Sequence, residues 1–138
     1  MDRNKYFKIA QEFIGIPYCH GGRDMKGLDC LGLVYLFYKK VGINIPDNDG
    51  KEYSLEWYKK DPERLLRGIQ QVGKEVAIHS EPLQPLDLVY FRIGGAITHA
   101  GIMLDKDCFI HVMIGQLIHI TRFSPAWKRR LQGARRLI

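Results

Sequence analysis

The chain has 138 residues, of which 46% are apolar and 26% are charged, a balance that is typical of a soluble globular protein. The length predicts one domain over residues 1–138, and no apolar run approaches the roughly 18 residues of a transmembrane helix. Lys and Arg exceed Asp and Glu by 21 − 15 = 6, which suits an anionic partner such as a cell wall, a membrane surface or nucleic acid without choosing among them.

Helical patterns dominate the first half of the chain. Apolar residues on one face predict a helix over residues 2–14, and a turn-rich loop over residues 16–22 follows it. The most regular helix is predicted over residues 30–41, with Asp29 as its N-cap and Gly42 just after its last turn. The remaining segments are predicted to be an irregular stretch, a short helix and a helix capped by an aspartate before a proline, at residues 43–50, 52–60 and 61–68.

Short runs of β type replace the helical spacing from about residue 72. Turn signals such as Gly94-Gly95 and residues 105–107 separate the runs, and closely spaced strands joined by short turns imply an antiparallel sheet. Helices first and strands later is the α+β layout. The expected strands span residues 74–78, 86–92, 97–104, 108–112, 117–123 and 133–138.

Cys30 stands in the first turn of the predicted 30–41 helix. A helix N-terminus favours the thiolate, so we expect a lowered pKa and a reactive thiol at this position. A small cysteine buried in the core is the alternative, and this stretch alone leaves both open. Cys19 and Cys108 cannot both pair with it, and the spacing of the three cysteines fits no compact zinc site, so we expect no metal and no cofactor.

A cysteine nucleophile needs a base, and the base usually needs a group that orients it. His99 and His111 lie in two predicted strands that the turn at residues 105–107 would make neighbours, so both imidazoles would share one patch of sheet. One can be the base while the other accepts its second ring N–H. The phenol of Tyr18 could donate to an oxyanion beside the backbone N–H of Cys30. Structural histidines and a packed tyrosine are the alternatives.

Several segments carry motifs in a consistent order. They cover the loop with Tyr18, the Cys30 helix start and its end, the strand before His99, the His99 strand and the segment that ends at His111, at residues 15–22, 27–34, 41–46, 83–91, 99–104 and 109–111. Together they resemble the NlpC/P60 family of papain-like cysteine peptidases. The resemblance implies a papain-like α+β fold in which N-terminal helices pack on a C-terminal antiparallel sheet.

The resemblance also implies roles for particular residues. Cys30 would be the nucleophile, His99 the base and His111 the group that orients the base. Tyr18 would help to polarise the scissile carbonyl, and Asp29 would belong to the same oxyanion and substrate-binding region. Family members commonly cleave bacterial cell-wall peptides next to a D-glutamyl residue, so the expected partner is a peptidoglycan stem peptide.

Three positions depart from the family pattern, and none of them removes a catalytic group. They are His20, Leu31 and Leu86. We expect His20 and Leu31 near the substrate cleft, where they would alter substrate preference.

The segment 127–136 resembles the end of short NlpC/P60 proteins from phage tails and prophages, and no signal peptide is visible at the start. We therefore expect synthesis in the cytoplasm and carriage in a tail particle, with other tail proteins as candidate partners. A non-enzymatic tail component and an acyltransferase or lipid-acting relative on the same fold are the competing functions. Nucleic-acid binding is not expected, because the cations are not interleaved with aromatic residues in one segment.

Overall fold

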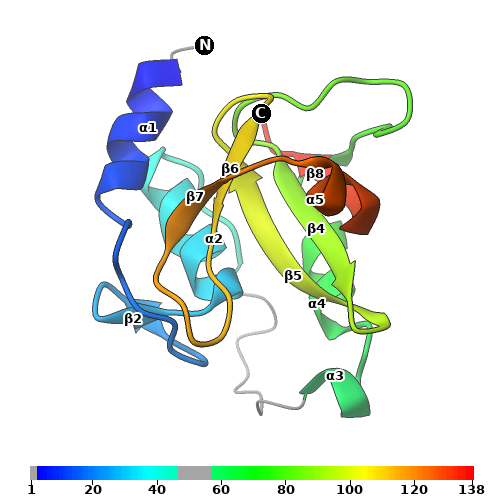
Figure 1. The fold of residues 1–138 in the computed structure, drawn as a ribbon, viewed down its shortest axis with the longest axis horizontal. Helices are drawn as coiled ribbons and strands as arrows, with labels where there is room; N and C mark the ends of the chain where they lie inside the picture. Colours follow the sequence, from blue (N-terminus) through cyan, green and yellow to red (C-terminus); the bar gives the residue numbers. More distant parts are fainter. Residues whose placement is uncertain (1–2, 47–56) are drawn as a thin grey trace.

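A six-stranded antiparallel sheet forms the centre of the protein (Figure 1). The structure is a computed structural model that describes residues 3–46 and 57–138. In their order across the sheet, the strands are Lys74–Glu75 (β3), Leu131–Arg136 (β8), Leu88–Ile93 (β4), Ala96–Met103 (β5), Cys108–His111 (β6) and His119–Arg122 (β7). The α+β prediction is confirmed.

Both faces of this sheet are covered, because its central strands alternate between two apolar cores. Leu88 and Tyr90 of β4 belong to a large core shared with α1 (Arg3–Gln11) and α2 (Cys30–Lys40). Val89 and Phe91 of the same strand point to a smaller core that also contains Phe109 and Trp127. Trp127 belongs to α5 (Pro125–Arg130), which packs on β4 away from α1 and α2 (Figure 1). This period-two alternation is expected of a strand that is buried on both sides.

Helix α2 has well-formed ends. The Asp29 side chain accepts from the backbone N–H of Gly32, which confirms the predicted N-cap. At the other end Gly42 has φ +90°, and the N–H of Ile43 donates to the carbonyl of Tyr38 at 2.8 Å. This is the hydrogen-bond pattern of a helix ended by a glycine in the left-handed region, so the predicted helix and both its caps are present.

Other elements differ from the prediction. The first helix ends at Gln11 rather than at residue 14, and α5 was not predicted, although Ser124 caps it and a proline follows the cap. The structure also has a small hairpin of Arg23–Asp24 (β1) and Gly27–Leu28 (β2). The strands agree with prediction to within a few residues at each end.

The segment between α2 and the sheet is only partly described. Residues 47–50 of the predicted irregular stretch and residues 52–56 of the predicted short helix lie outside the described residues. The rest of that helix is present as α3 (Trp57–Lys60). The next helix, α4 (Arg64–Gln70), begins later than expected, because Asp61 does not cap it and instead pairs with both ends of the Arg67 guanidinium.

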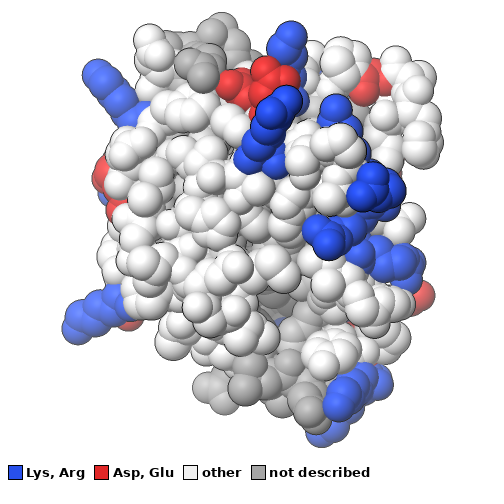
Figure 2. Space-filling view, viewed as in Figure 1, with Lys and Arg blue, Asp and Glu red and all other residues white. Residues whose placement is uncertain are grey.

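The cations at the end of the chain divide into two groups. Arg136 donates to both oxygens of buried Asp87, at 2.9 and 2.8 Å, and Arg135 donates to backbone carbonyls around Val72. These two arginines fasten β8 to the rest of the fold. Residues 128–130 instead lie on α5, on the side of the molecule where Lys and Arg gather in Figure 2. Within the described ranges, no helix has both the length and the apolar character that crossing a membrane would require.

Candidate active site

The loop that precedes α2 is fastened to the start of that helix by the carboxylate of Asp29. One oxygen accepts from the N–H of Gly32 and from the guanidinium of Arg23, both at 2.8 Å, and the other accepts from the N–H of Gly21 at 2.9 Å. Only 3% of Asp29 is exposed. Such a buried carboxylate stabilises the fold because charge-assisted hydrogen bonds replace its contact with water. The loop and the helix start are therefore held as one unit.

Two glycines allow the backbones of this unit to approach closely. A Cβ on Gly32 would lie 2.2 Å from the carbonyl oxygen of Gly22, and a Cβ on Gly22 would lie 2.2 Å from the carbonyl oxygen of Gly27. Any side chain at either position would force these backbone segments apart. This explains physically why glycines stand at both positions of the loop and helix motifs.

Tyr18 is positioned by backbone hydrogen bonds on both sides. Its own N–H donates to the carbonyl of Gln116 at 2.9 Å, and its neighbours Pro17 and Cys19 exchange hydrogen bonds with Leu28. The Tyr18 hydroxyl lies 3.4 Å from Nδ1 of His20. Burial, with smaller contributions from Cys30, Asp29 and Cys19, raises the pKa of the Tyr18 phenol. The phenol therefore stays protonated and can donate a hydrogen bond.

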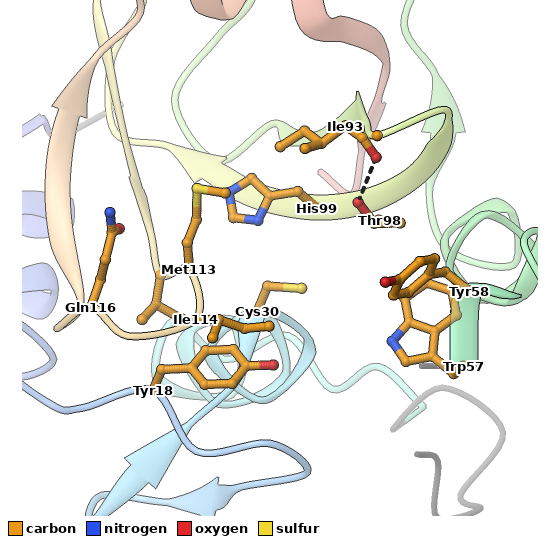
Figure 3. A pocket seen from close by; sticks show the side chains of 12 residues that line it. Tyr18, Cys30, Trp57, Tyr58, Ile93, Thr98, His99, Met113, Ile114 and Gln116 are labelled. Atoms are coloured by element: carbon orange, nitrogen blue, oxygen red, sulfur yellow. Dashed lines mark hydrogen bonds between the residues drawn. The ribbon is translucent and has the colours of Figure 1, made fainter. Parts of the chain in front are cut away.

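A pocket of about 450 Å³ brings three of the predicted site residues together (Figure 3). Tyr18 and Cys30 lie on one side of it, His99 lies above them, and Trp57 and Tyr58 of α3 form a separate aromatic wall. The volume is within the range of small-ligand sites. The lining residues are Tyr18, Cys30, Trp57, Tyr58, Ile93, Gly94, Thr98, His99, Val112, Met113, Ile114 and Gln116.

His99 and His111 form a hydrogen-bonded pair. Nε2 of His99 lies 2.8 Å from Nδ1 of His111, and Nε2 of His111 lies 2.8 Å from the hydroxyl oxygen of Thr121. The Trp127 ring packs against both imidazoles, with centroids 5.7 Å from His99 and 5.0 Å from His111. The predicted juxtaposition of the two histidines is thus present.

Burial keeps both imidazoles neutral. Burial, with smaller contributions from neighbouring histidines, lowers the pKa of His99 to about 3 and that of His111 to about 2. Neutral imidazoles each carry one N–H, so His99 and His111 can share a single hydrogen bond without repulsion. Across residues 3–46 and 57–138, no group of three His, Cys, Asp or Glu side chains could hold a metal ion.

The Cys30 thiol differs from the sequence prediction in its electrostatics. Burial first, and the Asp29 carboxylate second, raise the pKa of Cys30 to about 12. Backbone hydrogen bonds from Ala100 and Leu31 and the charge of Arg23 act in the opposite direction but do not offset burial. The expected lowering of the pKa by the helix N-terminus is therefore wrong for the resting protein, because desolvation outweighs it.

Cys30 of α2 and His99 of β5 line the same pocket. No hydrogen bond joins the described thiol to the described imidazole, and in Figure 3 the Cys30 sulfur is directed away from the ring. One nitrogen of His99 is turned to the side of the pocket where Cys30 lies, while Nε2 is occupied by His111. A rotation about one torsion of the small Cys30 side chain would change the direction of the sulfur.

Three other positions lie outside the pocket lining. Asp29 is engaged by the N–H groups of Gly21 and Gly32 and by Arg23, and these hydrogen bonds position the start of the Cys30 helix. Leu31 lines a separate small hollow together with Val34 and Tyr35, not the pocket of Cys30. His20 is not among the lining residues, and its Nδ1 lies 3.4 Å from the Tyr18 hydroxyl.

Sequence comparison identifies the family to which this chain belongs. The sequence profile of the NlpC/P60 family matches residues 15–136. The chain belongs to the NlpC/P60 family. It is 36% identical over 137 residues to murein DD-endopeptidase MepH of Escherichia coli K12, and 29% identical over 126 residues to murein DD-endopeptidase MepS/murein LD-carboxypeptidase of the same strain. These alignments cover 95% and 90% of this chain but only 44% and 57% of the relatives.

Structure comparison shows the NlpC/P60 fold. An NlpC/P60 family protein from Bacillus cereus aligns with a TM-score of 0.71 and 23% sequence identity. The alignment covers 99% of this chain and 40% of the Bacillus protein. The arrangement of helices and sheet described above is therefore that of the family.

The sequence analysis missed several residues around the site. Thr121 was not singled out, although it lies in the predicted strand 117–123, which pairs with the strand that contains His111. Trp127 was assigned only to a basic terminal segment, and it covers the histidine pair from α5. Trp57 and Tyr58 belong to no motif that the sequence analysis recognised, so only the three-dimensional structure reveals that they line the pocket.

We predict that Asp29→Ala destabilises the protein by about 2 kcal/mol or more, because it removes a helix cap, the ion pair with Arg23 and the acceptor of the Gly21 N–H. Asp29→Asn keeps an oxygen for the cap and should cost less. Urea unfolding of both variants and the parent measures this. A fully stable Asp29→Ala variant that has lost activity would instead indicate a direct contact with substrate.

Cysteine labelling should follow the electrostatics of the resting site. At pH 7 iodoacetamide should modify exposed Cys19 before Cys30, and the Cys30 rate should rise about tenfold for each pH unit from 7 to 9, since the thiolate fraction does so below the pKa. Peptide mapping after brief treatment follows each site. Fast labelling of Cys30 that is already independent of pH between 6 and 7 would contradict the raised pKa.

Proposed function

We propose that this chain is a cysteine peptidase that cleaves stem peptides of bacterial peptidoglycan, next to a D-glutamyl residue. Cys30 acts as the nucleophile, His99 as the base, His111 as the orienting group and Tyr18 as an oxyanion donor. The observation that carries the proposal is the shared pocket of Cys30 and His99, with His99 hydrogen-bonded at 2.8 Å to His111. The names of the two Escherichia coli relatives, both murein endopeptidases, support the substrate class.

Acylation begins when the Cys30 thiol turns toward His99. The thiol proton passes to Nδ1 of His99, and the sulfur attacks the scissile carbonyl carbon. Because Cys30 and His99 are both neutral at rest, this transfer creates two opposite charges only when substrate is present. In this mechanism His99 carries its resting proton on Nε2, and this N–H, directed at Nδ1 of His111 2.8 Å away, stabilises the imidazolium that forms.

The tetrahedral intermediate carries a negative oxygen that needs donors. The Tyr18 hydroxyl can supply one hydrogen bond, and the backbone N–H of Cys30, in the first turn of α2, can supply another. The carbon–nitrogen bond then breaks, and the leaving amine takes the proton from Nδ1 of His99. A thioester on Cys30 remains. Water, deprotonated by His99, attacks this thioester and releases the carboxylic acid and the free thiol.

The 127–136 segment predicts that the chain is a component of a phage or prophage tail, with tail proteins as partners, and this stays a prediction. The competing functions, a non-enzymatic tail component and an acyltransferase-type relative, make different predictions for substrate turnover. The first would bind wall fragments without cleaving them. The second would transfer an acyl group to an acceptor other than water.

Purified peptidoglycan fragments with intact stem peptides provide the decisive substrate. The parent should produce a new pair of fragments whose masses identify a bond beside the D-glutamyl residue, and Cys30→Ala should produce none. Cys108→Ala is the matched control, because Cys108 lies in β6 outside the pocket lining and should keep the activity. Mass spectrometry identifies the fragments that the parent, Cys30→Ala and Cys108→Ala each produce. The proposal fails if the parent leaves every fragment intact or if Cys30→Ala cleaves like the parent.

A further inference from the structure

We propose that Thr121 is a positioning residue of this site: its hydroxyl accepts the Nε2–H of His111 and thereby fixes which nitrogen of His99 is free to take a proton. The inference rests on the proposed peptidase function and adds a fifth residue to its machinery. Thr121 does not line the pocket, so it acts through His111 and not on the substrate.

The geometry forms a continuous chain across three strands. His99 on β5, His111 on β6 and Thr121 on β7 are linked by two contacts of 2.8 Å each. In the register of β6 and β7, Thr121 pairs with Phe109 and His119 pairs with His111. Thr121 is thus the diagonal neighbour of His111 on the same face of the sheet, within reach of its ring.

The hydrogen bonds that link His99, His111 and Thr121 can be donated in two directions. A neutral imidazole has one N–H donor and one acceptor nitrogen, so the two ring contacts must share one sense. If His99 donates from Nε2, then His111 accepts at Nδ1 and donates from its own Nε2 to Thr121. In the opposite sense His111 donates to His99, and His99 carries its proton on Nδ1. Only the first sense leaves Nδ1 of His99 able to accept the Cys30 proton.

The surroundings of His111 favour Thr121 as the acceptor of its Nε2–H, as donation from His99 to His111 to Thr121 requires. His111 is 1% exposed, so water cannot easily replace a lost partner for its Nε2–H. Its other ring neighbour, His119, has Nδ1 engaged with the carbonyl of Leu117 at 2.8 Å. Thr121 is only partly buried, so its own hydroxyl proton can point outward to solvent. A neutral hydroxyl also fits a site that keeps His111 uncharged.

The test compares Thr121→Val, which keeps the shape and removes the hydroxyl, with Thr121→Ser, which keeps the hydroxyl. Thr121→Val should lower kcat about tenfold with KM unchanged, because an unpaired buried N–H favours the wrong tautomer, and Thr121→Ser should recover most of the loss. Ile120→Val is the matched control on the opposite face of β7 and should behave like the parent.

Nitrogen NMR of labelled histidines gives a readout that does not need activity. In the parent, His99 and His111 should both be protonated on Nε2, and in Thr121→Val a population protonated on Nδ1 should appear in both rings. Unchanged tautomers together with unchanged kcat in Thr121→Val overturn the proposal, as does a Thr121→Ser variant that is as impaired as Thr121→Val. If Thr121→Val does not fold, Thr121→Ala takes its place. A parent that cleaves nothing would refute the peptidase function while the NMR result still decides the role of Thr121.

Discussion

The buried carboxylate of Asp29 is the contact on which the candidate site depends. It joins the N–H of Gly21, the N–H of Gly32 and the guanidinium of Arg23, so the loop that carries Tyr18 cannot move independently of the helix that carries Cys30. Close backbone packing between Gly22 and Gly32 makes the same unit rigid. Rigid placement matters because a nucleophile and an oxyanion donor act together only when both are held in register with the substrate.

The sheet supplies the other half of the site in a different physical environment. His99 and His111 are buried on a face that Trp127 covers, so they remain neutral and their hydrogen bonds are strengthened by the low local dielectric. A neutral thiol and a neutral base cost less to bury than a preformed ion pair. Charge separation is thereby postponed until a substrate carbonyl can receive the sulfur and donors can receive the oxyanion.

The sequence predicted the features that local patterns determine. The cap at Asp29, the end of α2 at Gly42 and the strands around His99 and His111 follow from side-chain spacing and turn residues. Features that depend on distant neighbours were missed or predicted wrongly. Arg67 takes the Asp61 carboxylate away from its expected cap, and burial by the sheet reverses the expected pKa shift of Cys30. Thr121 acquires its importance only from the register of β6 and β7.

The central claim is that Cys30 forms a covalent intermediate with the acyl part of a wall peptide, and intact-protein mass spectrometry tests it most directly. The chain is mixed with a peptidoglycan stem peptide, quenched in acid during turnover, weighed and then mapped by proteolysis. The account predicts an added mass equal to the acyl fragment, located on Cys30 and absent from Cys30→Ala. Product formation with no adduct at any time, or an adduct on Cys19 or Cys108 instead, would contradict it.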